Sequence, residues 1–396
     1  MLVDYDLLDL GDLLNADVSY EDRTIVNLAY DIAIKNFRSI DIGEVRDLFV
    51  NFEQYPSAEE QAFLASIRKA TGKLIGYLRF NEVFVLGATG LIVDPKHKII
   101  LIGRSLGWTQ DRVVKMLDAH FSVTRLASNR YRIDERTLYD GAETLERAEL
   151  ISAPGYQVYG HWLLDVIPRL YVHKYCNPSP SDCLLAPRPP LWASDFVSSM
   201  GYESQQFGYL TPQSIKFIKQ LDVHTLARYG VIFDRRLSTV AWKALTCFLG
   251  ESILSTYPVS PQPLNKHSSL YVSRASWNKA RILSNSSEVA DILAGYDVKT
   301  IHPQDYGLSS QMHMFSEADL VLGEDGSGLH NFLYSSQRGI LGVISLGRTN
   351  LWHAGLAQAK QWRVAYVSAE KDMNSDDRFI LDGANLRKLI TLAGHK

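Results

Sequence analysis

The chain has 396 residues, 46% of them hydrophobic and 21% charged, which suits two or three folded domains with apolar cores. Its formal net charge is −3 and its basic residues form no block, which argues against a nucleic-acid partner. The N-terminal sequence is acidic and no apolar stretch reaches about 18 residues, so we expect a cytoplasmic protein without a secretory signal or a transmembrane segment. Peripheral association with a membrane stays open.

The three cysteines are too few for a disulfide framework, and no Cys-x-x-Cys or His-Glu-x-x-His spacing occurs. We therefore expect reduced thiols and no metal site built by the protein. No cofactor is required on this view, although a divalent ion accompanying a diphosphate ligand stays compatible with the sequence.

Residues 1–257 are expected to form one α/β domain in three parts. Residues 1–75 are expected to be mainly helical, because apolar positions recur every three or four residues, as at Ile25, Leu28 and Ile32. Short β-branched and aromatic runs divided by turn residues predict a β-meander over 78–106. Residues 107–257 complete the α/β domain. The three prolines of 258–265 predict an extended linker.

Residues 266–396 alternate regularly between strand and helix patterns, which predicts a parallel sheet with helices on both faces. The expected strands are 269–274, 297–302, 319–323 and 339–347. The expected helices are 286–295, 309–318, 327–336 and a last one near 384–392.

Ligands of open α/β sheets bind beyond the carboxyl ends of the strands. The predicted strand 319–323 leads into a glycine-rich loop, Gly323–Gly328, whose backbone N–H groups suit a diphosphate. Arg274 ends a neighbouring strand and Arg281 follows it, and arginines bind phosphate through paired hydrogen bonds. The alternatives are an ordinary strand–helix turn and surface salt bridges. The carboxylates of Glu324 and Asp325 oppose phosphate binding unless they face a sugar, a ribose hydroxyl or the acceptor.

A row of polar side chains crosses the apolar segment 155–170. His161, Asp165 and Arg169 stand at positions i, i+4 and i+8, so they share one face of a helix, which Pro168 is expected to kink or end. One interpretation is a buried ion network or a solvated stripe. The other is a His–Asp pair that serves as a general base. Tyr159 and Trp162 offer flat faces that suit sugar rings, although aromatic residues more often form core.

Together these segments resemble the family-61 glycosyltransferases. The family pattern Asn-x-x-His-Trp-Leu-x-Asp-x-Leu-Pro-Arg-Leu is similar to Gln157–Leu170, and the resemblance spans roughly residues 80–347. Further matches are Ser273–Arg274, Arg281 with Asn285 and Glu288, Gln311 with Phe315, and the loop Gly323–Asn331. Two positions depart from the pattern, since Asp325 stands where the family usually has histidine and Gln157 or Val158 where asparagine is common.

The resemblance implies a GT-B architecture, with two Rossmann-like domains facing each other across a cleft. The domain 1–257 would take a glycan or glycolipid acceptor, and the domain 266–396 would take the nucleotide-sugar donor. It also implies inverting transfer of a hexosyl or pentosyl group, most simply from a UDP-linked donor. Without the membrane anchor of eukaryotic relatives, the chain resembles bacterial members that make capsular or other surface polysaccharide.

The roles that follow fall into three sets. His161 is expected to be the catalytic base with Asp165 orienting it, or Asp165 is the base itself. Candidate sugar or acceptor contacts are Tyr159, Trp162, Glu324 and Asp325. The expected donor-binding residues are Arg274, Arg281, Asn285, Gly326, Ser327, Gly328 and Asn331.

Three other functions remain open. The chain is alternatively a non-catalytic nucleotide- or glycan-binding relative, or a transferase that uses a CMP-linked acid sugar. A nucleotide-sugar epimerase or dehydrogenase would predict an early Gly-x-Gly-x-x-Gly turn, and the sequence has none.

Overall fold

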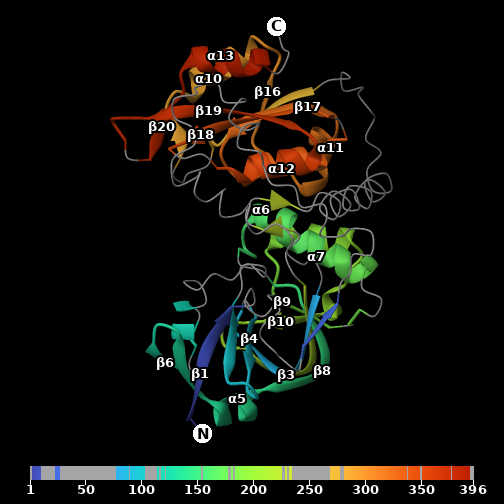
Figure 1. Cartoon of the computed structure of the whole chain (residues 1–396). Coiled ribbons are helices and arrows are strands. Elements are labelled where there is room, and N and C mark those ends of the chain that lie inside the picture. The colour runs from blue at the N-terminus through green and yellow to red at the C-terminus, as the bar shows by residue number, and fades with distance from the viewer. Residues whose placement is uncertain are drawn as a thin grey trace. The chain divides into compact units, whose positions relative to one another are not determined.

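The computed structural model describes part of the chain, and Figure 1 shows it. The described residues are 2–9, 23–26, 77–102 without 89, 114–224 without 116, 121, 153–154, 177–179 and 182, 228–229, 232–233, and 268–392 without 277–280, 337, 348–349 and 376. They divide into two compact units, the first ending at Tyr229 and the second containing the residues from Ile232 onward. The predicted linker 258–265 lies outside the described residues, and the domain boundary there stays a prediction.

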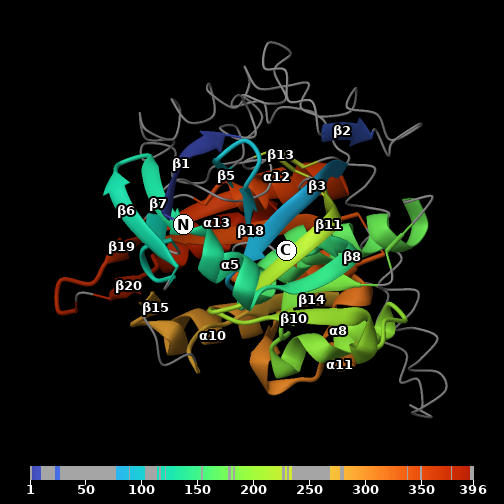
Figure 2. The same cartoon turned by 90° about the horizontal axis from the view of Figure 1, so that it is seen from below.

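The first unit is built on one large mixed sheet. Within the described residues it has eleven strands, in the order β10-β9-β8-β11-β3-β4-β5-β1-β7-β6, and β2 pairs with β3. Their bounds are β1 Leu2–Asp9, β2 Arg23–Val26, β3 Tyr77–Leu86, β4 Leu91–Asp94, β5 Ile99–Ile102, β6 Val123–Ala127, β7 Arg130–Asp134, β8 Glu143–Leu150, β9 Leu184–Pro187, β10 Phe207–Leu210 and β11 Ile215–His224. Figure 2 shows β3, β11 and β8 side by side, as their pairing requires.

The predicted β-meander over 78–106 is confirmed, because β3, β4 and β5 pair antiparallel in sequence order. The expected helical character of residues 1–75 is wrong for the two described pieces, 2–9 and 23–26, which are strands. In 3–7, apolar and acidic residues alternate, so that Tyr5 is buried in the core while Asp4 pairs with Arg130 and Arg132 on β7. That two-residue period is typical of a strand. The remaining residues of 1–75 lie outside the described part.

Four neighbouring strands of this sheet, β10, β9, β8 and β11, are parallel, and β1 and β5 form a second parallel pair. The helical elements of the unit are α5 Glu135–Gly141, α6 Tyr159–His161, η4 Trp162–Val166, α7 Ile167–Tyr171, η5 Val172–Cys176, η6 Leu191–Ala193, α8 Ser194–Ser199 and η7 Ser204–Gln206. The core under the sheet is formed by aromatic and β-branched side chains of β3, β4 and β5 packed against β8 and β11. A separate two-stranded sheet joins β12, Arg228–Tyr229, and β13, Ile232–Phe233.

The second unit contains a seven-stranded sheet in the order β15-β20-β19-β18-β17-β14-β16 within the described residues. Its strands are β14 Ser268–Val272, β15 Ile282–Leu283, β16 Lys299–Ile301, β17 Ala318–Glu324, β18 Ile340–Leu346, β19 Arg363–Lys371 and β20 Arg378–Ile380. Its helices are α10 Ser286–Ala294, η8 Pro303–Asp305, α11 Leu308–Ser316, η9 Ser327–Tyr334, α12 Trp352–Lys360 and α13 Gly383–Leu392. Within this unit, α10 and α13 lie on one face of the sheet, and α11 and α12 lie on the other (Figure 1).

The predicted alternation of strands and helices in the second half is confirmed. The five strands β14, β16, β17, β18 and β19 are all parallel; β18 is buried along its whole length, and β17 is buried except at Asp319. Strands buried on both faces have continuous apolar sequences, which is why this half was readable from the sequence. The structure adds α12 and β19, and it makes the predicted helix 327–336 a 3₁₀ helix.

The order of these strands creates a switch point. The chain runs from β14 outward to its neighbour β16, and then returns to the other side of β14 as β17. Parallel sheets with helices on both faces bind ligands at this reversal, beyond the carboxyl ends of the two strands. The reversal therefore lies where β14 ends near Arg274 and β17 ends at Glu324. No helix in the described part of the chain is long and apolar enough to cross a membrane.

Candidate functional site

The switch point of the second unit brings Arg274 onto the glycine loop. The Arg274 side chain donates from Nη1 to the backbone oxygen of Asp325 at 3.4 Å. A Cβ atom at Gly326 would lie 2.4 Å from that same Nη1, so the absence of a side chain at Gly326 is what lets the guanidinium cross the loop. Burial lowers the pKa of Arg274, and the charge of Arg281 lowers it further. A cation that is already costly to hold would gain from a bound anion.

Glu324, the last residue of β17, is buried beneath Arg274. Its Oε1 accepts hydrogen bonds from the Tyr271 hydroxyl at 2.6 Å and from the backbone N–H of Arg274 at 3.2 Å. Burial raises the pKa of Glu324, and these two hydrogen bonds offset only part of that effect. Glu324 is 1% exposed, and through these two hydrogen bonds it stabilises the end of β14. Its predicted contact with a sugar or acceptor stays a prediction.

Asp325 is the centre of a second polar cluster. Oδ1 accepts from Asn350 Nδ2 at 2.8 Å and from His353 Nε2 at 3.0 Å, and Oδ2 accepts from Arg281 Nη1 at 3.2 Å. Burial alone would raise the pKa of Asp325, but the hydrogen bonds from His353 and Asn350 and the charge of Arg281 lower it to about 2. The carboxylate is thus ionised, fully buried and compensated.

Two predicted donor residues are engaged elsewhere in the fold. The Arg281 side chain, 38% exposed, pairs with Asp325. Asn285 precedes α10, and its amide binds the backbone of Leu381 twice, donating to the carbonyl at 2.8 Å and accepting from the N–H at 3.1 Å. Both contacts have structural roles that the sequence did not reveal, and donor contacts for the two residues stay predictions.

The loop continues directly into η9, so Ser327 and Gly328 occupy its first turn. The first N–H groups of a helix lack partners within the helix and attract anions. Deeper in the same helix, Asn331 is fully buried and donates from Nδ2 to Gln311 Oε1 at 2.7 Å. This contact locks η9 to α11, so in this structure Asn331 braces the loop from behind.

The predicted polar row of the first unit lies on a helical segment of mixed type, residues 159–176. Regular α-helical turns, α6 and α7, alternate with two π-helical turns, η4 and η5. Pro168 was expected to kink or end the helix. Instead it occupies the start of α7 directly after the π turn, where a missing N–H is tolerated. The segment therefore stays helical beyond Pro168, and Arg169 is buried, donating to the carbonyl of Ser152 at 2.6 Å.

His161 and Asp165 form the expected pair. His161 Nδ1 lies 2.7 Å from Asp165 Oδ2, the imidazole is 23% exposed, and the carboxylate is 1% exposed. A carboxylate at Nδ1 fixes the tautomer that leaves Nε2 able to accept a proton. Gly155 faces the ring: it has a φ of +83°, and a Cβ there would lie 2.3 Å from the imidazole Cδ2. Gly155 is therefore required by the position of His161.

Trp162 does not offer a sugar platform. It is fully buried, donates from Nε1 to the Tyr156 carbonyl at 2.6 Å, and stacks on Phe196. Because Trp162 is buried on all sides, it is part of an aromatic core, which was the alternative interpretation of this residue. Tyr159 packs instead against Trp192, with ring centroids 5.6 Å apart. Trp192 follows β9 on η6 and is 39% exposed, which makes it the better candidate for a flat contact surface.

The sequence patterns did not indicate three residues of the candidate sites, His353, Asn350 and Trp192. The first two bind Asp325 across 28 and 25 residues of sequence, a distance at which no local spacing pattern operates. Trp192 follows a Pro-Arg-Pro-Pro sequence that indicates a loop and nothing more. Among the described residues, no group of three or more His, Cys, Asp or Glu side chains is arranged to hold a metal ion.

Comparison with known proteins supports one assignment. Residues 159–341 match the model of the family Glycosyltransferase 61. The match begins at the first residue of α6 and continues through β17 and the glycine loop into β18, so it includes the His161–Asp165 pair, Arg274 and Asp325 but not Asn350 and His353. A search of curated proteins finds no match.

Proposed function

Because residues 159–341 belong to the Glycosyltransferase 61 family, we propose that the chain transfers a hexosyl or pentosyl group from a UDP-linked sugar to a glycan or glycolipid acceptor. The proposal includes inversion at the anomeric carbon and a role in bacterial surface polysaccharide synthesis. It also includes a GT-B arrangement, with the donor bound by the second unit and the acceptor by the first.

The observation that carries the proposal is the position of Arg274 over Gly326 at the switch point. A nucleoside diphosphate is bound by a cation and by backbone N–H groups that point toward it. Arg274, which follows β14, supplies the cation, and the first turn of η9 supplies the N–H groups. Preorganised positive groups around a leaving diphosphate are usually the largest contribution to such a reaction. Arg274 and the N–H groups of Gly326–Gly328 are assigned that role.

The first unit supplies the base. In a single displacement, His161 Nε2 takes the proton of the acceptor hydroxyl while that oxygen forms a bond to the anomeric carbon. The bond from this carbon to the diphosphate oxygen breaks, and the diphosphate leaves with the electron pair. Asp165 holds the His161 tautomer and stabilises the imidazolium that forms, as its 2.7 Å contact with Nδ1 allows.

The acidic residue at 325 is compatible with this chemistry. The Asp325 carboxylate is buried and receives hydrogen bonds from His353, Asn350 and Arg281, so it does not present an unpaired negative charge to a diphosphate. The same contacts weaken the argument for a non-catalytic relative, which rested on this residue. Arg281 then acts on the donor site through Asp325.

Calorimetry with UDP, CMP and GDP tests the donor site. We expect UDP to bind, and Arg274→Ala to weaken binding at least tenfold, the scale of one lost charge-assisted pair. Arg387→Ala is the matched control, because Arg387 is an exposed arginine of the same unit, on α13. Unchanged UDP affinity in Arg274→Ala would remove the donor site from the switch point, and preferential CMP binding would favour an acid-sugar donor.

Transfer is measured separately with a panel of UDP-sugars and glycan acceptors, from the release of UDP. His161→Ala is expected to lower kcat by about 10²- to 10⁴-fold with unchanged UDP affinity, the usual effect of losing a general base. If His161→Ala retains full turnover and Asp165→Asn does not, Asp165 is the base.

A further inference from the structure

The polar row of the helical segment 159–176 continues one step beyond Arg169. His173 follows at the same four-residue spacing, in the π turn η5. In a regular α-helix this spacing drifts by about 40° per step, or about 120° from the first residue to the fourth. Turns closed by i→i+5 bonds contain more residues, so the two π turns reduce the drift. The row thus has His161 at its exposed end and His173, only 6% exposed, at its buried end.

Both ring nitrogens of His173 face groups that accept hydrogen bonds. Nδ1 lies 2.8 Å from the Tyr202 hydroxyl oxygen, whose own hydrogen is donated to the carbonyl of Leu170 at 2.7 Å. Nε2 lies 3.0 Å from the carbonyl oxygen of Ser181. A carbonyl can only accept, and a hydroxyl that has spent its hydrogen must accept as well. Both contacts are hydrogen bonds only if each nitrogen carries a proton, which makes His173 an imidazolium cation.

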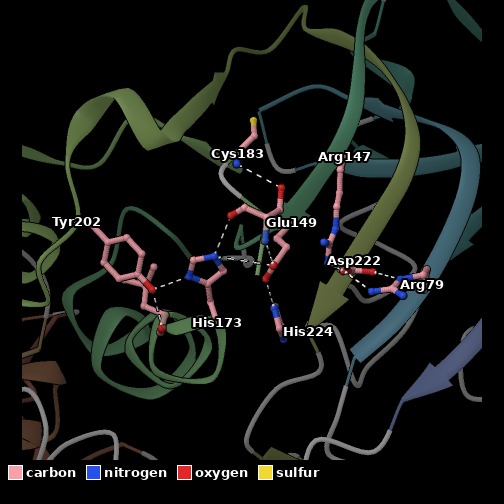
Figure 3. A network of polar contacts seen from close by, with 10 residues as sticks. Arg79, Arg147, Glu149, His173, Cys183, Tyr202, Asp222 and His224 are labelled. Carbon is pink, nitrogen blue, oxygen red and sulfur yellow. Dashed lines mark hydrogen bonds and ion pairs between the residues drawn. The ribbon is translucent and has the colours of Figure 1, made fainter. Parts of the chain in front are cut away.

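A buried anion stands beside this cation. Glu149, the penultimate residue of β8, is fully buried, and its Oε1 lies 3.8 Å from His173 Nε2 (Figure 3). Oε1 also accepts from the backbone N–H of Ser181 at 2.6 Å, and Oε2 lies 2.6 Å from His224 Nε2. A buried carboxylate requires a counter-charge, and the described ion-pair partners of Glu149 are His173 and His224.

The neighbouring charges identify His173 as that counter-charge. Asp222 pairs with Glu149 in register across β11 and β8, so two buried carboxylates share one face of the sheet. Arg79 and Arg147 both bind Asp222, at distances of 2.7 to 3.0 Å (Figure 3). These arginines pair with Asp222, whereas His173 and His224 pair with Glu149, and His173 is the histidine whose hydrogen-bond partners require two protons.

We infer that His173 is a buried imidazolium and that its ion pair with Glu149 makes both of them positioning residues for His161. Arg169 binds the carbonyls of Ile151 and Ser152, which directly follow β8, and His173 binds Glu149 within that strand. The row is therefore fastened at two successive turns to the carboxyl end of β8. This attachment sets where the opposite end of the same row places His161. The catalytic half of the inference rests on the proposed function, and the protonation half does not.

Nitrogen NMR of histidine-labelled protein at neutral pH tests the protonation half. The titratable groups in contact with His173 are Glu149 and Tyr202, and His224 lies at the other oxygen of Glu149. We expect both nitrogens of His173 to carry protons. His173→Gln assigns the signal. His120 is the internal comparison, because burial lowers its pKa and its Nδ1 accepts from the Ser122 N–H, so one of its nitrogens should be bare. An unprotonated ring nitrogen in His173 would overturn the inference and leave the proposed function unaffected.

The catalytic half is tested by Glu149→Gln, which keeps the shape of the side chain and removes its charge. We expect His173 to lose its second proton in the same NMR experiment, and kcat to fall by about 10- to 100-fold, the scale of a displaced catalytic group. Donor KM and UDP affinity should not change. Glu146→Gln is the matched control, being the same substitution on the same strand at an exposed residue that pairs with Lys219.

The outcomes separate the two hypotheses. A wild-type kcat in Glu149→Gln, or an equal change in donor KM and kcat, overturns the positioning role. If Glu149→Gln does not fold, His173→Gln is measured in the same assays and must show the same fall in kcat with unchanged donor KM. If no donor supports transfer by the wild type, the proposed function fails while the doubly protonated His173 remains measurable.

Discussion

Asp325 and His353 face each other at 3.0 Å in the second unit, with neither side chain exposed to solvent. Asp325 belongs to the glycine loop and directly follows β17, so the contact connects this loop to α12. It also explains how an acidic residue is accommodated where the family resemblance has histidine. A histidine at 325 would stand among His353 and Arg281, with no carboxylate to compensate them.

This relationship predicts a pH-dependent stability difference between the wild type and Asp325→Asn. The pKa of Asp325 is about 2 in the folded chain and about 3.9 in an unfolded one. A lowered pKa stabilises the fold above the unfolded value and loses its effect as the pH falls through the folded value. Asp325 therefore contributes about 3 kcal/mol near neutral pH. Urea unfolding should show that advantage above pH 5 and its decline as the pH falls from about 4 toward 2. A difference independent of pH would contradict it.

Gly326→Ala should weaken donor binding with little loss of stability. The nearest atoms to the added Cβ would all belong to the flexible Arg274 side chain, and only its far end, Nη1 at 2.4 Å, would clash. The guanidinium can move away, but it then leaves the loop. Gly323→Ala is the contrasting variant, because its Cβ would lie 2.5 Å from the backbone oxygen of Val272. We expect it to lower the free energy of unfolding by about 1–3 kcal/mol, the usual range for overpacking. Calorimetry with UDP and thermal unfolding separate the two, and a Gly326→Ala variant with wild-type UDP affinity would count against the assignment.

Gly155→Ala should act on the first unit alone. Its Cβ would displace the His161 imidazole, and its φ of +83° strains any residue with a side chain. We expect kcat to fall by about 10²-fold, as for a misplaced catalytic group, with UDP affinity unchanged. Gly201→Ala is the control, since Gly201 also has a positive φ but would contact only the end of Lys174. Equal losses of kcat in both variants would indicate general strain.

Trp192→Ala should raise the acceptor KM about tenfold, on the scale of an aromatic contact worth about 1 kcal/mol or somewhat more. Donor KM should be unaffected. Tyr139→Ala is the matched control: Tyr139 is also an exposed aromatic residue of the first unit, 52% exposed, and it packs against Phe84 and Phe217. If acceptor KM is the same in both variants, Trp192 does not bind the acceptor.

The sequence predicted the second unit better than the first, for a physical reason. Parallel strands such as β17 and β18 are buried on both faces, so their apolar runs and the turn residues between them are visible locally. In the first unit, the N-terminal strand β1 takes its place through pairing with β5 and β7, about 90 to 130 residues away. Its short alternation was outweighed by the helical spacing that follows it.

The candidate sites show the same division. His161 and Asp165 lie one turn apart and were paired correctly from spacing alone. Arg274 and Gly326 were grouped by the rule for strand ends, which the strand order bears out. The roles of Trp162 and His353 depend on burial and on contacts across the sheet, so no local pattern reported them. His173 was overlooked because Pro168 was expected to kink or end the helix before it.

The mixed helix type of residues 159–176 limits how this segment can be transplanted. A designer who copies its side chains onto an ideal α-helical scaffold would spread the four-residue row around the helix, by about 120° over its length. Arg169 and His173 could then no longer both contact the carboxyl end of β8 while His161 keeps its position, although every residue would be in its original order. The geometry of the proposed catalytic pair thus depends on the π-helical turns of the backbone as well as on the residues of the row.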